Sequence, residues 1–306
     1  MYTVSSSPHV KSNDSVQGIM RDVIIALIPA TIAGIYFFGM QAFLVTLVSV
    51  LSCIVAEALW QKLTHRKITI GDLSAVVTGL LIAFNMPAAV PLWLPAIGGF
   101  FAIIIVKQFF GGIGQNIMNP ALAARAFLLA SWPVHMTNFT VDGVSAATAL
   151  GILKEGGGDL PSMMNLFIGN VGGCIGETSV LALLIGAAYL LYKGIISWHI
   201  PVTYIGSVFI LTFIFGREGL MTGNALYEIF AGGLMIGAFY MATDYTTSPM
   251  TKKGQVVFGI GCGVLTATIR LYGGYAEGVS YSILIMSLFV PFIDKYTAPR
   301  IFGEVK

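Results

Sequence analysis

Charged residues are scarce in this chain: Asp, Glu, Lys and Arg make up 10% of its 306 residues, against roughly 25% in soluble globular proteins. Hydrophobic residues make up 56%, and the mean hydropathy is +0.85. The composition therefore predicts an integral membrane protein with several spans in the lipid bilayer. The formal net charge is only +2, so the charge balance gives no indication of a nucleic-acid partner.

Cysteine and histidine are also few, which limits the metal sites that the chain could form. Cys53, Cys174 and Cys262 lie far apart in apolar segments and form no Cys-x-x-Cys pair, a pattern that favours small buried side chains. A sulfur site shared with another polypeptide stays open. The four histidines lie near loops or segment ends, which argues against a transmembrane b-type haem.

Two nucleotide-binding motifs are absent from the sequence. No Gly-x-x-x-x-Gly-Lys-Ser/Thr loop occurs, so we do not expect ATP to drive this chain directly. No Rossmann fingerprint follows a strand, so NAD is expected to bind elsewhere. The sequence gives no catalytic residue and no metal ligand.

The apolar runs predict about ten membrane segments, five in each half of the chain. A polar loop at about Pro133–Pro161 separates the halves. The first half contains Val23–Phe38, Phe43–Trp60, Leu73–Phe84, Leu94–Phe110 and Pro120–Trp132. The second half contains Thr178–Tyr192, Ile200–Phe215, Leu226–Met241, Val256–Leu271 and Val279–Phe292.

The two halves resemble one another at a nearly constant offset. Gly111-Gly112 after Lys107 corresponds to Gly273-Gly274 after Arg270, and Asp72 corresponds to Glu228. Such weak internal symmetry is typical of duplicated membrane folds. Because five spans per half is an odd number, the second half must enter the membrane upside down, which makes the repeats inverted.

The distribution of Lys and Arg predicts the orientation of the chain. With the N-terminus in the cytoplasm, twelve Lys or Arg residues fall on the inner side and three on the outer side, as the positive-inside rule requires. The first 20 residues are polar, so we expect no cleavable signal peptide. We expect a cytoplasmic segment at 1–20, repeats at 21–132 and 166–296, an extracytoplasmic loop at 133–165 and a cytoplasmic tail at 297–306.

Several segments are too short to span a bilayer core of ~30 Å, which needs roughly 20 helical residues. Leu73–Phe84 and Pro120–Trp132 are the shortest, and Gly and Pro crowd their ends. Paired half-helices at corresponding positions of two repeats point to a central site. We therefore expect an all-α polytopic membrane protein with two inverted five-helix repeats and broken half-helices. The alternative is a plain ten-helix bundle with a few short tilted helices.

The polar loop contains the sequence Asp142-Gly-Val-Ser145-Ala-Ala147-Thr148. This Asp-x-x-Ser-x-Ala-Thr pattern resembles the acceptor site at which FMN is joined to a threonine through a phosphoester. Small residues would keep the backbone accessible to a transferase, and Asp142 could orient the acceptor hydroxyl. Thr148 is therefore the predicted flavin anchor, against the alternative of an ordinary loop that leads into Leu150.

Several further motifs extend the resemblance. They are Gly111-Gly-Ile-Gly-Gln-Asn116, Asn119-Pro-Ala121, Arg125-Ala-Phe127, Met241-Ala-Thr-Asp244 and Thr247-Ser-Pro249. Together with Asp142–Thr148 they identify the chain as similar to a family that includes the D subunit of Rnf complexes, which are ferredoxin:NAD oxidoreductases that pump Na⁺ or H⁺. The same family includes the B subunit of the Na⁺-translocating NADH:quinone reductase. The resemblance covers about residues 18–300. Ala146 departs from the Gly or Ser more usual there.

The resemblance implies a redox role in a bacterial cytoplasmic membrane. It implies FMN esterified to Thr148 by a flavin transferase, with Asp142, Ser145 and Ala147 in the acceptor motif. It implies electron exchange with the other Rnf subunits (A, B, C, E and G), of which G has its own covalent FMN. By similarity to the quinone reductase, a second, non-covalent flavin, riboflavin, is also expected.

Arg125 lies inside an apolar segment, where a charge costs about 3 kcal/mol on insertion scales and usually has a partner. It follows the helix-breaking Asn119-Pro120, and a helix N-terminus with an arginine suits a phosphate or a reduced flavin anion. Arg125 and Asn119 are therefore candidate cofactor-binding residues. The alternative for Arg125 is snorkelling or a structural pair with Glu57 or Asp72.

Asp244 ends an apolar run and is followed by hydroxyl residues that include Thr247. Their oxygens could line a cation path or bind a flavin edge, and a capped loop at the inner surface is the alternative.

Two functions compete at this point. The first is a membrane electron-transfer subunit of an ion-translocating oxidoreductase. The second is a small-solute channel or transporter with the same repeats, which would need no acceptor threonine outside the membrane.

Overall fold

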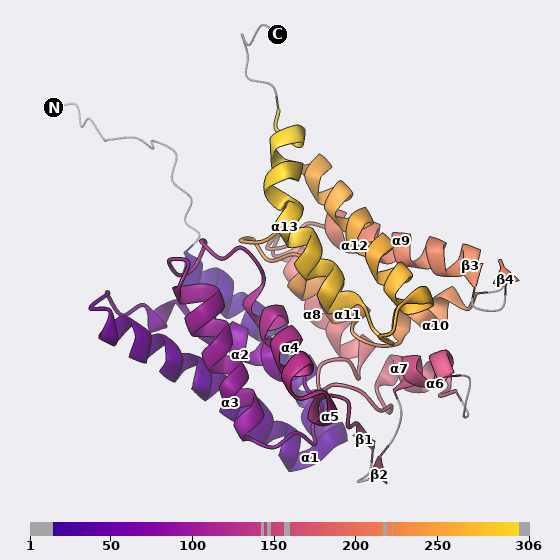
Figure 1. The fold of residues 1–306 in the computed structure, drawn as a ribbon, viewed down its shortest axis with the longest axis horizontal. Helices are drawn as coiled ribbons and strands as arrows, with labels where there is room; N and C mark the ends of the chain where they lie inside the picture. Colours follow the sequence, from indigo (N-terminus) through magenta and orange to yellow (C-terminus); the bar gives the residue numbers. More distant parts are fainter. Residues whose placement is uncertain are drawn as a thin grey trace, which may run out of the picture.

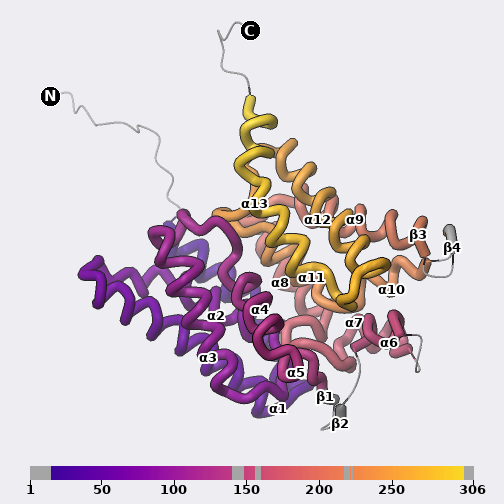
Figure 2. The backbone as a smooth tube through the Cα atoms, in the orientation of Figure 1, coloured from indigo at the N-terminus to yellow at the C-terminus, as the bar shows by residue number. Residues whose placement is uncertain are grey.

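The computed structural model describes residues 15–141, 144–145, 148–155, 160–216, 219–221 and 223–299. Helices make up nearly all of the regular structure in these ranges, with two short hairpins. Figure 1 shows the helices of the first half at the lower left and those of the second half at the upper right. The start of α1 and the end of α13 lie at the top of this view, and α5, α6 and α7 lie toward the bottom (Figures 1 and 2).

The first two predicted segments belong to one element, α1, Val16–Leu63. Ser15 caps its start by accepting a hydrogen bond from the Gly18 N–H at 3.1 Å. Gly39 has φ 70° and ψ −155°, a conformation open essentially only to glycine, and it places a kink between the two stretches. The joint lies between the predicted segments Val23–Phe38 and Phe43–Trp60, and it consists of a single residue.

The rest of the first half contains two short helices around one longer one. The elements are η1 (Ile70–Asp72, a 3₁₀ turn), α2 (Ser74–Phe84), α3 (Trp93–Phe100), the π-helical η2 (Phe101–Gln108) and α4 (Pro120–Ser131). The 11 residues of α2 and the 12 of α4 cannot cross a bilayer core, which takes roughly 20. The expected shortness of these two segments is confirmed.

Side-chain hydrogen bonds lie at the start of both short helices. The Asp72 carboxylate accepts hydrogen bonds from the Ser74 N–H at 2.8 Å and the Ser74 hydroxyl at 2.6 Å. Asn119 Oδ1 accepts from the N–H groups of Ala121 and Leu122 at 3.0 and 3.3 Å. Pro120 occupies the first helical position, where its missing N–H costs nothing.

The predicted polar loop contains short elements. They are α5 (Pro133–Met136), β1 (Thr140–Val141), β2 (Val144–Ser145), α6 (Ala149–Glu155) and α7 (Met163–Ile168). The two strands form an antiparallel hairpin in which Thr140 pairs with Ser145 and Val141 with Val144. Lys154 of α6 donates to the Gly273 carbonyl at 2.6 Å. This contact docks α6 on the second half of the chain.

The second half also contains a broken segment. Its elements are α8 (Val180–Tyr192), α9 (His199–Ile214), β3 (Phe215–Gly216), β4 (Gly219–Leu220), α10 (Ala225–Phe230), α11 (Leu234–Ile236), the π-helical η3 (Gly237–Met241), α12 (Lys252–Tyr272) and α13 (Val279–Thr297). The predicted continuous segment Leu226–Met241 is interrupted at Gly232, which has φ 71°. The corresponding third segment of the first half, α2, has no such interruption.

The halves meet where the connection before α8 runs alongside the end of α2. The Ile175 N–H donates to the Met86 carbonyl at 2.9 Å, and the Gly176 N–H donates to the Phe84 carbonyl at 3.0 Å. A β-carbon at Gly176 would overlap the Phe84 side chain. The close approach therefore requires glycine at position 176.

Among the residues that the structure describes, three helices are long and apolar enough to cross a membrane: Val16–Leu63, Lys252–Tyr272 and Val279–Thr297. Shorter apolar helices accompany them, and large apolar side chains such as Ile32, Leu51, Val55 and Ile210 are exposed on their surfaces. Apolar side chains on the outside of a helical bundle suit lipid as the surrounding solvent. The chain is a helical membrane protein.

Buried ion pairs also lie in the helical core. Lys107 donates to Glu57 at 2.9 Å, and Arg270 pairs with Glu228 at 3.4 Å. The Arg270 side chain is fully buried. Its guanidinium also donates to the backbone carbonyls of Glu228 and Ala231, so this cation holds the region where the third segment of the second half breaks. Cys53, Cys174 and Cys262 are free and buried, as the sequence predicted.

Candidate functional site

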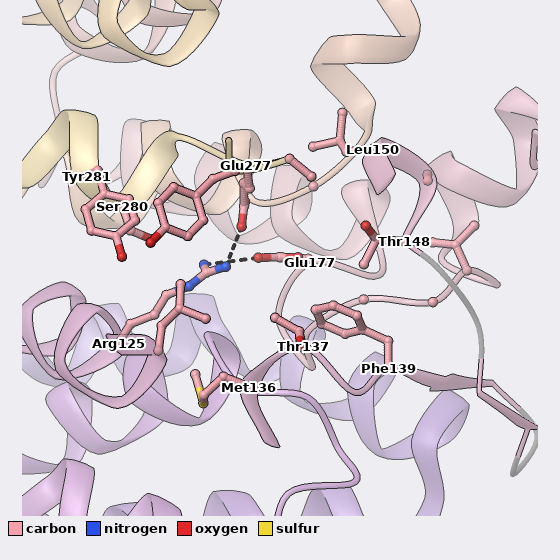
Figure 3. A pocket seen from close by; sticks show the side chains of 18 of the residues that line it. Arg125, Met136, Thr137, Phe139, Thr148, Leu150, Glu177, Glu277, Ser280 and Tyr281 are labelled. Carbon is pink, nitrogen blue, oxygen red and sulfur yellow. Dashed lines mark hydrogen bonds and ion pairs between the residues drawn. The ribbon is translucent and has the colours of Figure 1, made fainter. Parts of the chain in front are cut away.

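A pocket lies between α4, α6, α7 and the start of α13, and we call it the Thr148 pocket. Six of its lining residues matter for the argument: Arg125, Phe139, Thr148, Glu177, Glu277 and Tyr281. Figure 3 shows Arg125 with Glu277 and Glu177 close to its guanidinium, and Thr148 on the opposite side of the pocket above Phe139. The predicted anchor and the predicted intramembrane cation therefore share one pocket.

Thr148 stands immediately before α6 and is partly buried. Its Oγ1 accepts a hydrogen bond from the Gly151 N–H at 3.1 Å, so the hydroxyl caps the helix. Ser145 lies in β2, on the far strand of the hairpin before Thr148. Asp142 and Ala147 lie outside the described residues.

Arg125 is held by three side chains from separate parts of the chain. Its Nη1 donates to Asn85 Oδ1 at 2.8 Å and to Glu177 Oε1 at 3.2 Å. Its Nη2 pairs with Glu277 Oε2. These contacts join α4 to the end of α2, to the connection before α8 and to the connection before α13. The suggested structural partners Glu57 and Asp72 are wrong.

The Glu277 carboxylate binds a backbone N–H group as well as Arg125. Besides Arg125, it accepts from the Gly233 N–H at the start of α11. A β-carbon at Gly233 would lie 2.5 Å from Glu277 Oε1 and 2.9 Å from Glu177 Oε1. Glycine at 233 therefore lets the break in the third segment of the second half close onto both carboxylates.

Sequence reasoning did not find Glu277, Asn85 or Glu177 as partners of Arg125. The available signal was charge: an arginine inside an apolar segment needs a carboxylate, and few acidic residues stand at segment ends. Glu177 lies immediately before the sixth predicted segment, and Glu277 lies two residues before the tenth. Choosing them over Glu57 or Asp72 required the three-dimensional arrangement.

A second pocket, which we call the Asn119 pocket, lies at the other ends of α2 and α4. Its polar lining includes Ser74, Lys107, Asn116, Asn119 and Asp244. Asn119 Nδ2 donates to the Met241 carbonyl at 3.4 Å, so this residue ties the start of α4 to the end of η3. Arg125 does not line this pocket, and the structure thus separates the two residues that the sequence grouped at one helix start.

Asp244 both caps a loop and lines a pocket, the two alternatives that the sequence left open. Its carboxylate accepts from the hydroxyls of Thr246 at 2.9 Å and Thr247 at 3.2 Å, which makes a capped loop. It also lines the Asn119 pocket, where Asn116 Nδ2 donates to Thr246 Oγ1 at 3.0 Å. Thr247 is buried beneath this loop. Burial raises the pKa of the Asp244 carboxyl, against the hydrogen bonds from the two threonines.

Comparison with known proteins agrees with the motifs. The sequence pattern of the NQR2, RnfD, RnfE family matches residues 3–303. The chain is 52% identical to the D subunit of the Na(+)-translocating ferredoxin:NAD(+) oxidoreductase complex of Acetobacterium woodii, over 99% of this chain and 96% of the relative. It is 47% identical to the D subunit of the proton-translocating ferredoxin:NAD(+) oxidoreductase complex of Clostridium ljungdahlii, with the same coverage.

A relative with lower identity also matches over the full length of this chain. The D subunit of the ion-translocating oxidoreductase complex of Aliivibrio salmonicida is 35% identical over 100% of this chain and 99% of the relative. These matches run through both halves and both pockets, so they concern the whole fold and not one motif. The chain belongs to the NQR2, RnfD, RnfE family.

Proposed function

We propose that this chain is the membrane-embedded electron-transfer subunit, the D subunit, of an ion-translocating ferredoxin:NAD⁺ oxidoreductase complex, and that it carries FMN esterified to Thr148. The names of its full-length relatives support the complex and the oxidoreductase activity. The observation that carries the flavin proposal is the position of Thr148: its hydroxyl faces a pocket whose opposite wall holds a buried arginine.

The residues of the Thr148 pocket fit a tethered flavin. Phe139, Tyr275 and Tyr281 provide apolar and aromatic surface for a ring system. The Arg125 guanidinium is only 12% exposed and offers a positive charge near which a reduced, anionic flavin is stabilised. Thr148 would hold the phosphate and leave the ring free. When bound, FMN supplies one- and two-electron redox chemistry that no side chain of this chain provides.

The proposed fold is ten spans in two inverted repeats with broken half-helices. Support comes from corresponding ion pairs: Lys107 at the end of η2 holds Glu57 and Ser74 near the start of α2, and Arg270 at the end of α12 holds Glu228 in α10. In each half, a buried cation at the end of the fourth segment binds a residue of the short third segment. The positive-inside distribution supports cytoplasmic termini and an extracytoplasmic Thr148 in a bacterial inner membrane.

The Asn119 pocket is the proposed place for a second, non-covalent flavin, riboflavin. Amide and hydroxyl groups of Asn116, Asn119 and Thr246 line it and suit the polar edge of an uncharged flavin. Asp244 and Thr247 remain candidates for an ion path at the same end of the chain. The partners proposed with this function are the A, B, C, E and G subunits of the complex and a flavin transferase.

The competing proposal is a small-solute channel or transporter without a redox role. The breaks at Gly232 and before α2 would suit it as well, because transporters also bind substrate between broken helices. The ion pairs that close the centre of the Thr148 pocket favour the redox proposal. Arg125 is bound there by Glu177 and Glu277, and side chains fixed in this way suit a cofactor site better than an open path.

The test is in-gel flavin fluorescence with intact mass, after expression beside a flavin transferase. Wild type should give a fluorescent band that is heavier by FMN less water, and Thr148→Val should give a dark band of unmodified mass. Thr137→Val is the matched control, because Thr137 lines the same pocket and should leave the flavin in place. A dark wild-type band beside an active transferase would refute the flavin proposal and favour the transporter.

A further inference from the structure

The polar cluster in the Thr148 pocket has an unequal number of charges. Arg125 is its cation, while Glu177 and Glu277 both approach the guanidinium. The exposed fractions of these side chains are 12% for Arg125, 7% for Glu177 and 17% for Glu277. With both carboxyl groups ionised the cluster has a net charge of −1 in a poorly hydrated site, where an unbalanced charge is costly.

The two carboxylates are not equally stabilised. Glu277 has Arg125 and the Gly233 N–H as partners. Glu177 has a longer contact with Arg125, at 3.2 Å, and the Cys174 N–H at 3.5 Å. Both carboxylates share the single Arg125 guanidinium, so a proton is bound more readily by the carboxylate that has the weaker partners. Glu177 is therefore the member of the pair that binds the proton.

Charged and titratable groups from several neighbouring elements face this pair. Arg125 of α4 and Arg270 of α12 act on its charge, and the Cys174 N–H donates to Glu177. Tyr275 and Tyr281 line the same pocket, and Glu228 of α10 pairs with Arg270. Glu177 and Glu277 themselves lie in connections outside the helices. Burial, followed by the charge of Glu277, raises the pKa of Glu177 to about 7. Burial also acts to raise the pKa of Glu277, but the charges of Arg125 and Arg270 outweigh it and lower this pKa.

We propose that Glu177 takes up one proton from the outer aqueous phase when the flavin on Thr148 is reduced, so that electron transfer to this pocket is coupled to protonation of the chain itself. The inference rests on the proposed function. Electrons come from the reduced carriers of the complex. Two-electron reduction places one proton on the flavin ring and leaves the ring anionic. This adds a second unbalanced negative charge beside Arg125, and a proton on Glu177 removes it.

The proton count follows from this balance. On the alkaline side of neutrality, Glu177 is mostly ionised while the flavin is oxidised, and reduction raises its proton affinity. Two electrons then bring in two protons, one bound by the flavin and one by the Glu177 carboxylate. For a two-electron reduction, each proton taken up lowers the midpoint potential by about 30 mV per pH unit. When the flavin and Glu177 each take up one proton, the midpoint potential should therefore fall by about 59 mV per pH unit. When Glu177 takes up none, it should fall by about 30 mV per pH unit.

The experiment is a redox titration of the flavinylated full-length chain with dithionite, followed by flavin absorbance, at several pH values just above neutral. Wild type should give the steeper slope and Glu177→Gln the shallower one. Glu57→Gln is the matched control, since Glu57 is an equally buried, ion-paired glutamate that does not line the Thr148 pocket. It should keep the steeper slope.

A second measurement detects the protonated Glu177 carboxyl group directly, by infrared spectroscopy. The reduced-minus-oxidised infrared spectrum should gain a protonated carboxyl band, and Glu177→Gln should lack that band. A shallow wild-type slope without a carboxyl band would overturn the coupling while the fluorescent band still supports the flavin. A wild-type chain without covalent flavin would overturn both. If Glu177→Gln fails to fold, the wild-type slope and infrared band decide alone.

Discussion

Removing Glu277 tests whether the ion-paired cluster stabilises the junction between the two halves. In Glu277→Ala, Arg125 loses its Nη2 partner, and the Gly233 N–H loses its acceptor. Breaking a buried pair by deleting one member costs about 3–5 kcal/mol, and the partial exposure of both groups favours the lower end. The lost backbone contact adds roughly 1 kcal/mol. We expect a destabilisation of about 4 kcal/mol.

The assay is equilibrium unfolding of the purified chain in mixed micelles, followed by tryptophan fluorescence. A double-mutant cycle with Arg125→Ala isolates the pair, and its coupling should exceed about 1 kcal/mol because the two sites share one network. Asp22→Ala serves as the control. Its carboxylate accepts from the Tyr189 hydroxyl at 2.9 Å, away from the pocket, so we expect a loss of roughly 1 kcal/mol or less.

The reasoning fails if Glu277→Ala unfolds within about 0.5 kcal/mol of wild type, the range of ordinary surface substitutions. The cluster would then be fully hydrated or the pair would not form. A large loss without coupling to Arg125 would instead assign the effect to the Gly233 contact alone.

Three further predictions concern the helices that frame the pockets. Gly79→Ala should lower the free energy of unfolding by about 1–3 kcal/mol, because the added β-carbon would lie 2.6 Å from the α1 backbone. Gly206→Ala is the control. Its added β-carbon would meet nothing within 4 Å, so the same unfolding assay should show no such loss. Asn119→Ala should cost about 1 kcal/mol through the lost cap of α4, and equal stability would show that the cap is dispensable. Lys154→Met should release α6, seen as faster amide hydrogen exchange at 149–155 with unchanged exchange in α12; equal rates in α6 would contradict the docking role of the lysine.

The sequence was sufficient for features that depend on local chemistry. Asn119-Pro120 predicts a capped helix start because both residue types satisfy the first helical turn, and the structure confirms it. The sequence also predicted which segments are too short to span the membrane, because their residue counts can be compared with the thickness of the bilayer core. Arg125 was identified as a residue in need of a partner from the cost of its charge in an apolar segment.

Features that depend on distant parts of the chain were not predictable. Glu277 lies 152 positions from Arg125, and no local pattern distinguishes it from Glu57 as a partner. The sequence divided α1 into two segments, but it did not show that the joint is the single residue Gly39, because the φ of a glycine cannot be known from the sequence. The acceptor motif before Thr148 stays a prediction from resemblance for Asp142 and Ala147.

The joint at Gly39 has a consequence for how chain length can change in this protein. A loop can absorb an added residue, but two helices that meet at one glycine cannot. One extra residue beside Gly39 would turn one arm of α1 by roughly 100° relative to the other. Ser49 and Ser52, which face Gly79 and Pro95 from the second arm, would then point away from the core. We therefore expect homologous chains to vary in length within exposed connections such as 64–68, and to keep the spacing from Pro29 to Ser52 unchanged.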